Sequence, residues 1–190
     1  MTAPRSIPRL AGGTGTGKTT LVNAVAAFIP DSERVVIIED TSEIQIAKPN
    51  LVRLEARPGQ VGLAAVTIRD LLRTPCACVR DRILLGEVRG GEAFDLLQAL
   101  NTGHAGTLST LHADSAGRAL ARFTTCVLMA GIELPYRAIR NNIAEALDLL
   151  AHIERRDGKR FVTEIFAIKG YDAALDRYEL ESMYNREPRP

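Results

Sequence analysis

Residues 12–19 form a glycine-rich segment that constrains the fold of this 190-residue chain more than any other feature. It matches the phosphate-binding pattern G-x-x-x-x-G-K-[ST] and reads Gly12-Gly13-Thr14-Gly15-Thr16-Gly17-Lys18-Thr19. Glycines let the backbone of such a loop point its N–H groups inward, and the N-terminus of the following helix adds positive potential. We therefore expect an α/β fold with a helix beginning at Lys18.

The same segment predicts which residues would hold ATP and Mg²⁺. Lys18 would reach the β- and γ-phosphates, and the hydroxyl of Thr19 would bind Mg²⁺. The remaining phosphate-binding residues are expected to be Gly12, Gly13, Thr14, Gly15, Thr16, Gly17 and Thr20.

The residues before the loop fit the usual buried strand poorly. Pro8 has no N–H to donate to a central ladder, so only Leu10 and Ala11 are expected to form a strand end. Either this strand is short or the sequence begins inside a larger protein.

Apolar runs alternate with helical patterns up to residue 147, which favours a mostly parallel sheet flanked by helices. The expected strands are 35–38, 83–85 and 107–111. The expected helices are 18–29, 66–73, 91–101, 115–130 and 136–147, with Asp114 as the N-cap of the fourth.

The pattern changes after residue 147. Strand-like segments at 148–153, 161–168 and 178–180, with a turn at 156–159, predict an antiparallel C-terminal edge on the sheet. We expect one domain over residues 1–182 and a flexible tail over 183–190.

Charge and hydropathy exclude several classes of protein. With 24 Lys and Arg against 23 Asp and Glu, the net charge of +1 does not favour a broad nucleic-acid surface. The arginines between 69 and 82 alternate with Asp70 and Asp81 and are interpreted as a solvated face. No sequence-specific nucleic-acid binding is expected.

A cytoplasmic location is expected because no apolar run reaches ~18 residues and no signal-peptide pattern is present.

The chain has three cysteines and three histidines, four of which are candidate zinc ligands. Cys76 and Cys78 lie one residue apart, and a zinc site that combined them with His104 and His112 fits no standard spacing. Reduced thiols, Cys126 included, are expected. His112 ends an expected strand and could reach a γ-phosphate, whereas His152 lies in an apolar strand and is interpreted as structural.

Carboxylates follow two of the expected strands. Glu39 and Asp40 end the first, with Glu43 close behind, and Glu87 ends the run 83–86. A nucleoside triphosphatase needs a carboxylate for Mg²⁺ or water at the carboxyl end of a strand beside the phosphate-binding loop. The carboxylates at residues 39–43 and Glu87 both meet this requirement.

Four motifs in this order resemble the type II and type IV secretion ATPases, the VirB11-like motors, and most closely those of the conjugal-transfer TrbB type. They are the Walker A loop 12–19, the Asp box 37–43, the Walker B segment 83–87 with its continuation to Glu92, and the His box 102–112. The resemblance covers about residues 10–180.

The resemblance implies a RecA-like P-loop core that hydrolyses ATP in a homohexameric ring at the cytoplasmic face of the inner membrane. The ring would power a type IV secretion or conjugation apparatus. Glu87 would be the Walker B acid and hold Mg²⁺, partly through water, and Glu39 or Glu43 would polarise water. His112 would face the nucleotide and Arg89 would sense phosphate.

Two departures from the family pattern matter. The family carries an N-terminal domain before this one, and here eleven residues precede the loop, so that domain is expected to be absent. Pro75 would interrupt the helix before Walker B. An alternative is therefore a truncated ATP-binding subunit with little turnover of its own. A RecA-like recombinase or helicase would share the fold, but the charge balance disfavours it.

Overall fold

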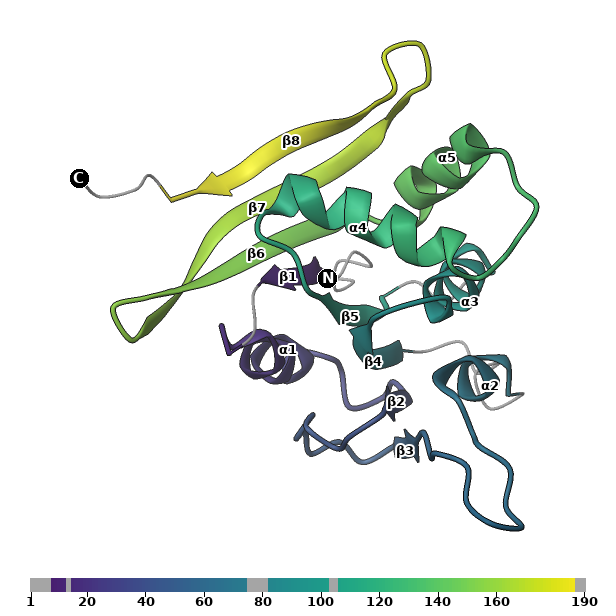
Figure 1. The fold of residues 1–190 in the computed structure, drawn as a ribbon. Coiled ribbons are helices and arrows are strands. Elements are labelled where there is room, and N and C mark those ends of the chain that lie inside the picture. Colours follow the sequence, from purple (N-terminus) through teal and green to yellow (C-terminus); the bar gives the residue numbers. More distant parts are fainter. Residues whose placement is uncertain (1–7, 13–14, 75–81, 103–105, 187–190) are drawn as a thin grey trace.

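The computed structural model describes residues 8–12, 15–74, 82–102 and 106–186 (Figure 1). Eight strands of this part form one sheet in the order β3-β2-β4-β5-β1-β6-β7-β8. The strands are β1 (Pro8–Gly12), β2 (Val35–Glu39), β3 (Leu51–Glu55), β4 (Arg82–Val88), β5 (Leu108–Leu111), β6 (Leu149–Arg156), β7 (Lys159–Asp172) and β8 (Arg177–Asn185). The helices are α1 (Lys18–Ala26), α2 (Ile68–Arg73), α3 (Glu92–Asn101), α4 (Ala116–Leu128) and α5 (Tyr136–Ala146).

The sheet is parallel from β3 through β6, and β7 and β8 add an antiparallel edge. Figure 1 shows α1 on one side of the sheet and α3, α4 and α5 on the other. The predicted mostly parallel sheet with helices and an antiparallel C-terminal edge is confirmed.

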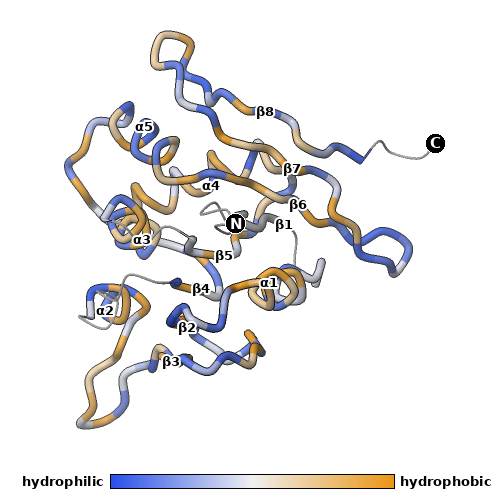
Figure 2. Tube along the Cα trace, turned by 180° about the vertical axis from the view of Figure 1, so that it is seen from behind, coloured by the Kyte–Doolittle hydropathy of each residue, from blue (hydrophilic) through white to orange (hydrophobic). Residues whose placement is uncertain are grey.

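Successive side chains of the central strands point to opposite faces of the sheet, and each face carries its own hydrophobic core. Val36 and Ile38 of β2 pack with residues of α2, α3, α4 and α5, while Val35 and Ile37 pack in a second cluster with residues of α1. Both faces of β2 are therefore buried, which explains its unbroken apolar run. Figure 2 shows hydrophobic residues on α1 and β5, whereas the turn between β6 and β7 is hydrophilic.

The first strand differs from the prediction. β1 is five residues long and lies between β5 and β6 in the middle of the sheet, so the expectation of a strand end at Leu10 and Ala11 alone is wrong. Pro8 is its first residue, where a missing N–H leaves the rest of the ladder intact.

Three further details of the secondary structure differ from the prediction. β3 was not predicted, because Leu51–Glu55 is a half-exposed edge strand without a long apolar run. Ser115, not Asp114, caps α4: its hydroxyl accepts a hydrogen bond from the Arg118 N–H. The expected tail from residue 183 is wrong as far as Asn185, because β8 pairs with β7 up to that residue.

None of the helices described here is both long and apolar enough to cross a membrane.

Candidate nucleotide-binding site

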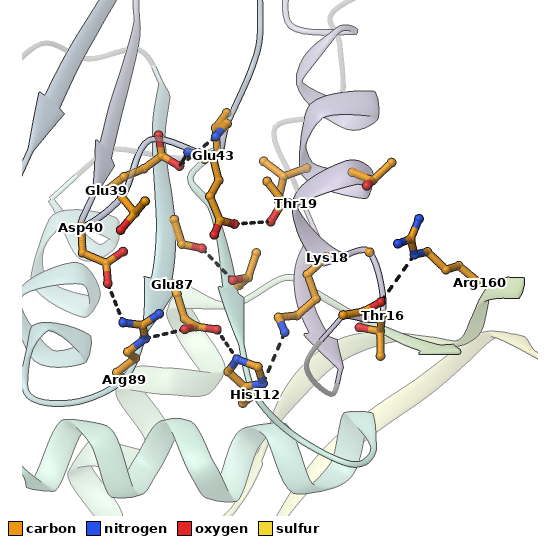
Figure 3. Close-up of a pocket in the computed structure, with 18 residues that line it drawn as sticks. Thr16, Lys18, Thr19, Glu39, Asp40, Glu43, Glu87, Arg89, His112 and Arg160 are labelled. Carbon is orange, nitrogen blue, oxygen red and sulfur yellow. Dashed lines mark hydrogen bonds and ion pairs between the residues drawn. The ribbon is translucent and has the colours of Figure 1, made fainter. Parts of the chain in front are cut away.

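A cavity of about 380 Å³ opens at the carboxyl ends of the parallel strands (Figure 3). The start of α1, the ends of β2, β4 and β5, and Arg160 of β7 contribute to its lining. Ligands of open parallel sheets bind at this edge.

The loop between β1 and α1 forms one wall. Gly15 and Gly17 have positive φ values of 71° and 96°, which favour glycine, and Gly17 is the N-cap of α1. A Cβ on Gly12 would lie 2.5 Å from the carbonyl oxygen of Ile153, so this position accepts no side chain. Gly13 and Thr14 lie outside the described residues. Thr16 and Thr20, like Gly15 and Gly17, line the cavity.

Lys18 is buried at the start of α1. Its Nζ donates to the carbonyl oxygen of Gly12 at 3.1 Å and lies 3.4 Å from Nδ1 of His112. Burial lowers the pKa of Lys18, and the nearby charges of Glu87 and Glu43 oppose this shift. An anion in the cavity would supply further compensation for the buried charge.

The two carboxylates of the Asp box have different surroundings. Glu39 is 4% exposed, and its Oε1 accepts the N–H groups of Glu43 at 3.0 Å and Ile44 at 2.9 Å. Glu43 points into the cavity and accepts the Thr19 hydroxyl at 3.1 Å. Glu39 thus orders the loop that places Glu43 beside α1.

Glu87 lies between His112 and Arg89 and contacts both. Its Oε1 lies 2.6 Å from His112 Nε2, and its Oε2 accepts Arg89 Nε at 2.5 Å. Arg89 also pairs with Asp40 at 2.5 Å, and the hydrogen bond to Glu87 raises the pKa of Arg89. Figure 3 shows Glu87 and His112 between Arg89 and Lys18.

Sequence reasoning missed two residues of this cavity, Thr110 and Arg160, and one ion pair of a third, Asp40. Thr110 is buried, and its hydroxyl donates to the carbonyl oxygen of Gly86 at 2.6 Å. Asp40 was noted as a strand-end acid, but its ion pair with Arg89 was not foreseen. Arg160 was assigned no role, because its contact with the loop joins residues 145 positions apart. The sequence feature that could have indicated Arg160 is the basic hairpin around residue 158.

Three further expectations from the sequence concern His152, Arg82 and the zinc alternative. His152 is 2% exposed and bonds to Thr163 through Nδ1 at 2.8 Å, as expected for a structural residue. Arg82, interpreted as part of a solvated face, is buried and pairs with Glu33. Cys76, Cys78 and His104 of the zinc alternative lie outside the described residues. Within the described residues, no cluster of three His, Cys, Asp or Glu side chains could hold a metal ion.

Together, the sheet, the glycine-rich loop and the buried lysine define an α/β fold with a candidate nucleotide-binding site at the carboxyl ends of its parallel strands. The family model described as "Type II/IV secretion system protein" matches residues 1–165. The chain belongs to this family, and the resemblance to VirB11-like secretion ATPases is confirmed.

Curated relatives from type IV secretion and conjugation systems are similar over most of the chain. Protein PtlH of Bordetella pertussis is 42% identical over 171 residues, covering 86% of this chain and 50% of the relative. VirB11 of Bartonella quintana is 40% identical, covering 83% and 45%. Conjugal transfer protein TrbB of Rhizobium radiobacter is 42% identical, covering 85% and 48%. The chain thus spans about half the length of the curated relatives it matches.

Solved structures support the same fold. The VirB11 ATPase of Brucella suis, crystallised with sulphate, matches with a TM-score of 0.76 and 34% identity, covering 86% of this chain and 48% of that one. The ATPase DotB of Legionella pneumophila matches with a TM-score of 0.64 and 23% identity, covering 87% and 46%, and shows the shared fold alone.

Proposed function

We propose that this chain binds ATP with Mg²⁺ and hydrolyses it as a subunit of a ring-shaped, homohexameric motor. The motor would power a type IV secretion or conjugal transfer apparatus at the cytoplasmic face of the inner membrane. The observation that supports this proposal most strongly is a shared cavity beside the glycine-rich loop. It is lined by Lys18, Thr19, Glu43, Glu87 and His112. Relatives named VirB11, PtlH and TrbB support the process.

The donor set fits ATP and Mg²⁺. Lys18 and the N–H groups at the start of α1 would bind the phosphates, and the Thr19 hydroxyl with Glu43 and Glu87 offers oxygen ligands of the kind that Mg²⁺ prefers. The ion would neutralise charge that develops on the phosphate oxygens. In the structure the Thr19 hydroxyl donates to Glu43. This bond must open or rearrange when Thr19 binds the ion.

The chain's own residues can prepare the attacking water. Glu87 is 13% exposed and held at both oxygens, by His112 and by Arg89, so its carboxylate is fixed in place. Glu43 faces the cavity, whereas Glu39 is occupied by backbone N–H groups. We therefore assign water orientation to Glu87 and Glu43, and loop positioning to Glu39. Arg89 acts by holding Glu87 and would sense phosphate through it.

Phosphate release and nucleotide binding, measured together on the 190-residue chain, test this proposal. Wild type should bind Mg·ATP and release phosphate, and Lys18→Ala should do neither. Binding without release would favour the alternative, an ATP-binding subunit with little turnover of its own. Absence of binding in the folded wild type would contradict both.

A further inference from the structure

Arg160 approaches the phosphate-binding loop from a part of the sequence that carries none of the recognised motifs. It is the second residue of β7 and follows the tight turn at Asp157 and Gly158, whose φ values are 49° and 75°. This turn brings the start of β7 to the loop, so a residue of the antiparallel edge lines the nucleotide cavity.

The loop accommodates the Arg160 side chain closely. Its Nε donates to the carbonyl oxygen of Gly15 at 3.5 Å. A Cβ on Gly17 would lie only 2.6 Å from Cδ of Arg160. The glycine at position 17 therefore satisfies a positive φ and also leaves room for the arginine stem.

Arg160 is exposed at the rim of the cavity, so its guanidinium is accessible to a ligand. A guanidinium offers five N–H donors, and among the residues that the structure describes its one hydrogen-bond partner is Gly15, at the long end of the range. It also lies beside the N-terminus of α1, whose partial charge is positive. An anion between them would be stabilised by both.

The position of Arg160 indicates which part of a nucleotide it would contact. Figure 3 shows Arg160 and Lys18 on opposite sides of the start of α1. Glu87 and His112 lie on the Lys18 side, where hydrolysis would occur. Arg160 is therefore remote from the groups that act on the γ-phosphate.

We propose that Arg160 binds the α- and β-phosphates that ATP and ADP share, and sets nucleotide affinity without taking part in hydrolysis. This inference rests on the proposed nucleotide-binding function. Charge-assisted hydrogen bonds from arginine to phosphate are among the stronger ones in proteins, and the guanidinium can make two at once.

Calorimetric titration of the 190-residue chain with Mg·ADP and with the non-hydrolysable analogue Mg·AMPPNP tests the inference. Arg160→Ala should raise both dissociation constants by a similar factor, about tenfold. The rate of ATP hydrolysis at saturation should stay unchanged. Arg160→Lys should recover part of the affinity because it keeps the charge and loses the two-pronged geometry.

Lys159→Ala is the matched control. It removes one positive charge from the adjacent position, whose side chain points to the opposite face of the strand, so both affinities should remain at the wild-type value. An equal loss in Lys159→Ala would overturn the inference in favour of general charge attraction. Unchanged affinities in Arg160→Ala, or a loss for AMPPNP alone, would also overturn it.

The outcome can be separated from the proposed function by using Lys18→Ala as a reference. If folded wild type binds neither nucleotide, the nucleotide-binding proposal itself fails. If wild type binds and Lys18→Ala does not, while Arg160→Ala binds as wild type does, only the assignment to Arg160 fails.

Discussion

Nε2 of His112 lies 2.6 Å from Oε1 of Glu87. The other ring nitrogen of His112 lies 3.4 Å from Nζ of Lys18, and an ammonium group can only donate, so Nδ1 accepts and Nε2 carries the proton that faces Glu87. The imidazole thus links Lys18 to Glu87 across the cavity.

Replacing His112 should therefore impair turnover. His112→Ala removes the group that orients Glu87, and we expect the hydrolysis rate to fall roughly 10- to 100-fold, as for other residues that hold a ligand group in place. His152→Ala is the control: it should lower the melting temperature and leave the rate per folded molecule unchanged. Equal rates in the two folded variants would contradict a role for His112.

Replacing Lys18 should abolish nucleotide binding without unfolding the protein. Lys18→Ala removes the charge beside the phosphates and also the cost of burying it, so we expect roughly 100-fold weaker ATP binding and a similar melting temperature. Lys169→Ala, from an exposed pair with Glu181, should bind ATP normally. Wild-type affinity in Lys18→Ala would show that the cavity is not the phosphate site.

Glu87→Gln should separate binding from hydrolysis. The amide keeps the shape of the side chain and loses the negative charge that acts on Mg²⁺ and water, so we expect the rate to fall at least about 100-fold with nearly unchanged ATP affinity. Single-turnover phosphate release and equilibrium titration measure the two effects. Glu181→Gln serves as the surface control, and loss of affinity rather than rate in Glu87→Gln would contradict the assignment.

Glu39 and Glu43 should respond differently to alanine substitution. Glu39→Ala leaves two N–H groups of the following loop without their acceptor, and we expect a loss of about 1–3 kcal/mol in the free energy of unfolding. Glu43→Ala should preserve stability and raise the Mg²⁺ concentration needed for half-maximal hydrolysis. Urea titration and a Mg²⁺ series measure these effects, and identical behaviour of the variants would refute the division of roles.

Cys126 should make stability depend on alkaline pH. Burial raises the pKa of its thiol, so the unfolded chain loses this proton more readily than the folded one. Its contribution to stability is complete below the ordinary thiol pKa and declines as pH rises above it. We expect the stability difference between wild type and Cys126→Ala to shrink between about pH 7 and about pH 10. A constant difference in urea denaturation would contradict this.

The sequence predicts those parts of the site that follow strand ends. The buried runs at 35–38 and 83–85 identify two central strands, and carboxylates just after them lie in the cavity because parallel strands end at one edge. The separate roles of Glu39 and Glu43 could not be predicted, because they depend on backbone N–H groups that only the folded loop presents. Arg160 could not be predicted either, since its place depends on how a distant hairpin pairs with β1.

The position of β1 also limits the order in which the protein can fold. Its neighbours in the sheet are β5 and β6, which begin at Leu108 and Leu149, so both of its hydrogen-bonded edges depend on residues made much later. Contacts across such separations slow folding because the chain must close long loops first. During synthesis β1 can therefore complete its pairing on both edges only after the residues of β6 have been made.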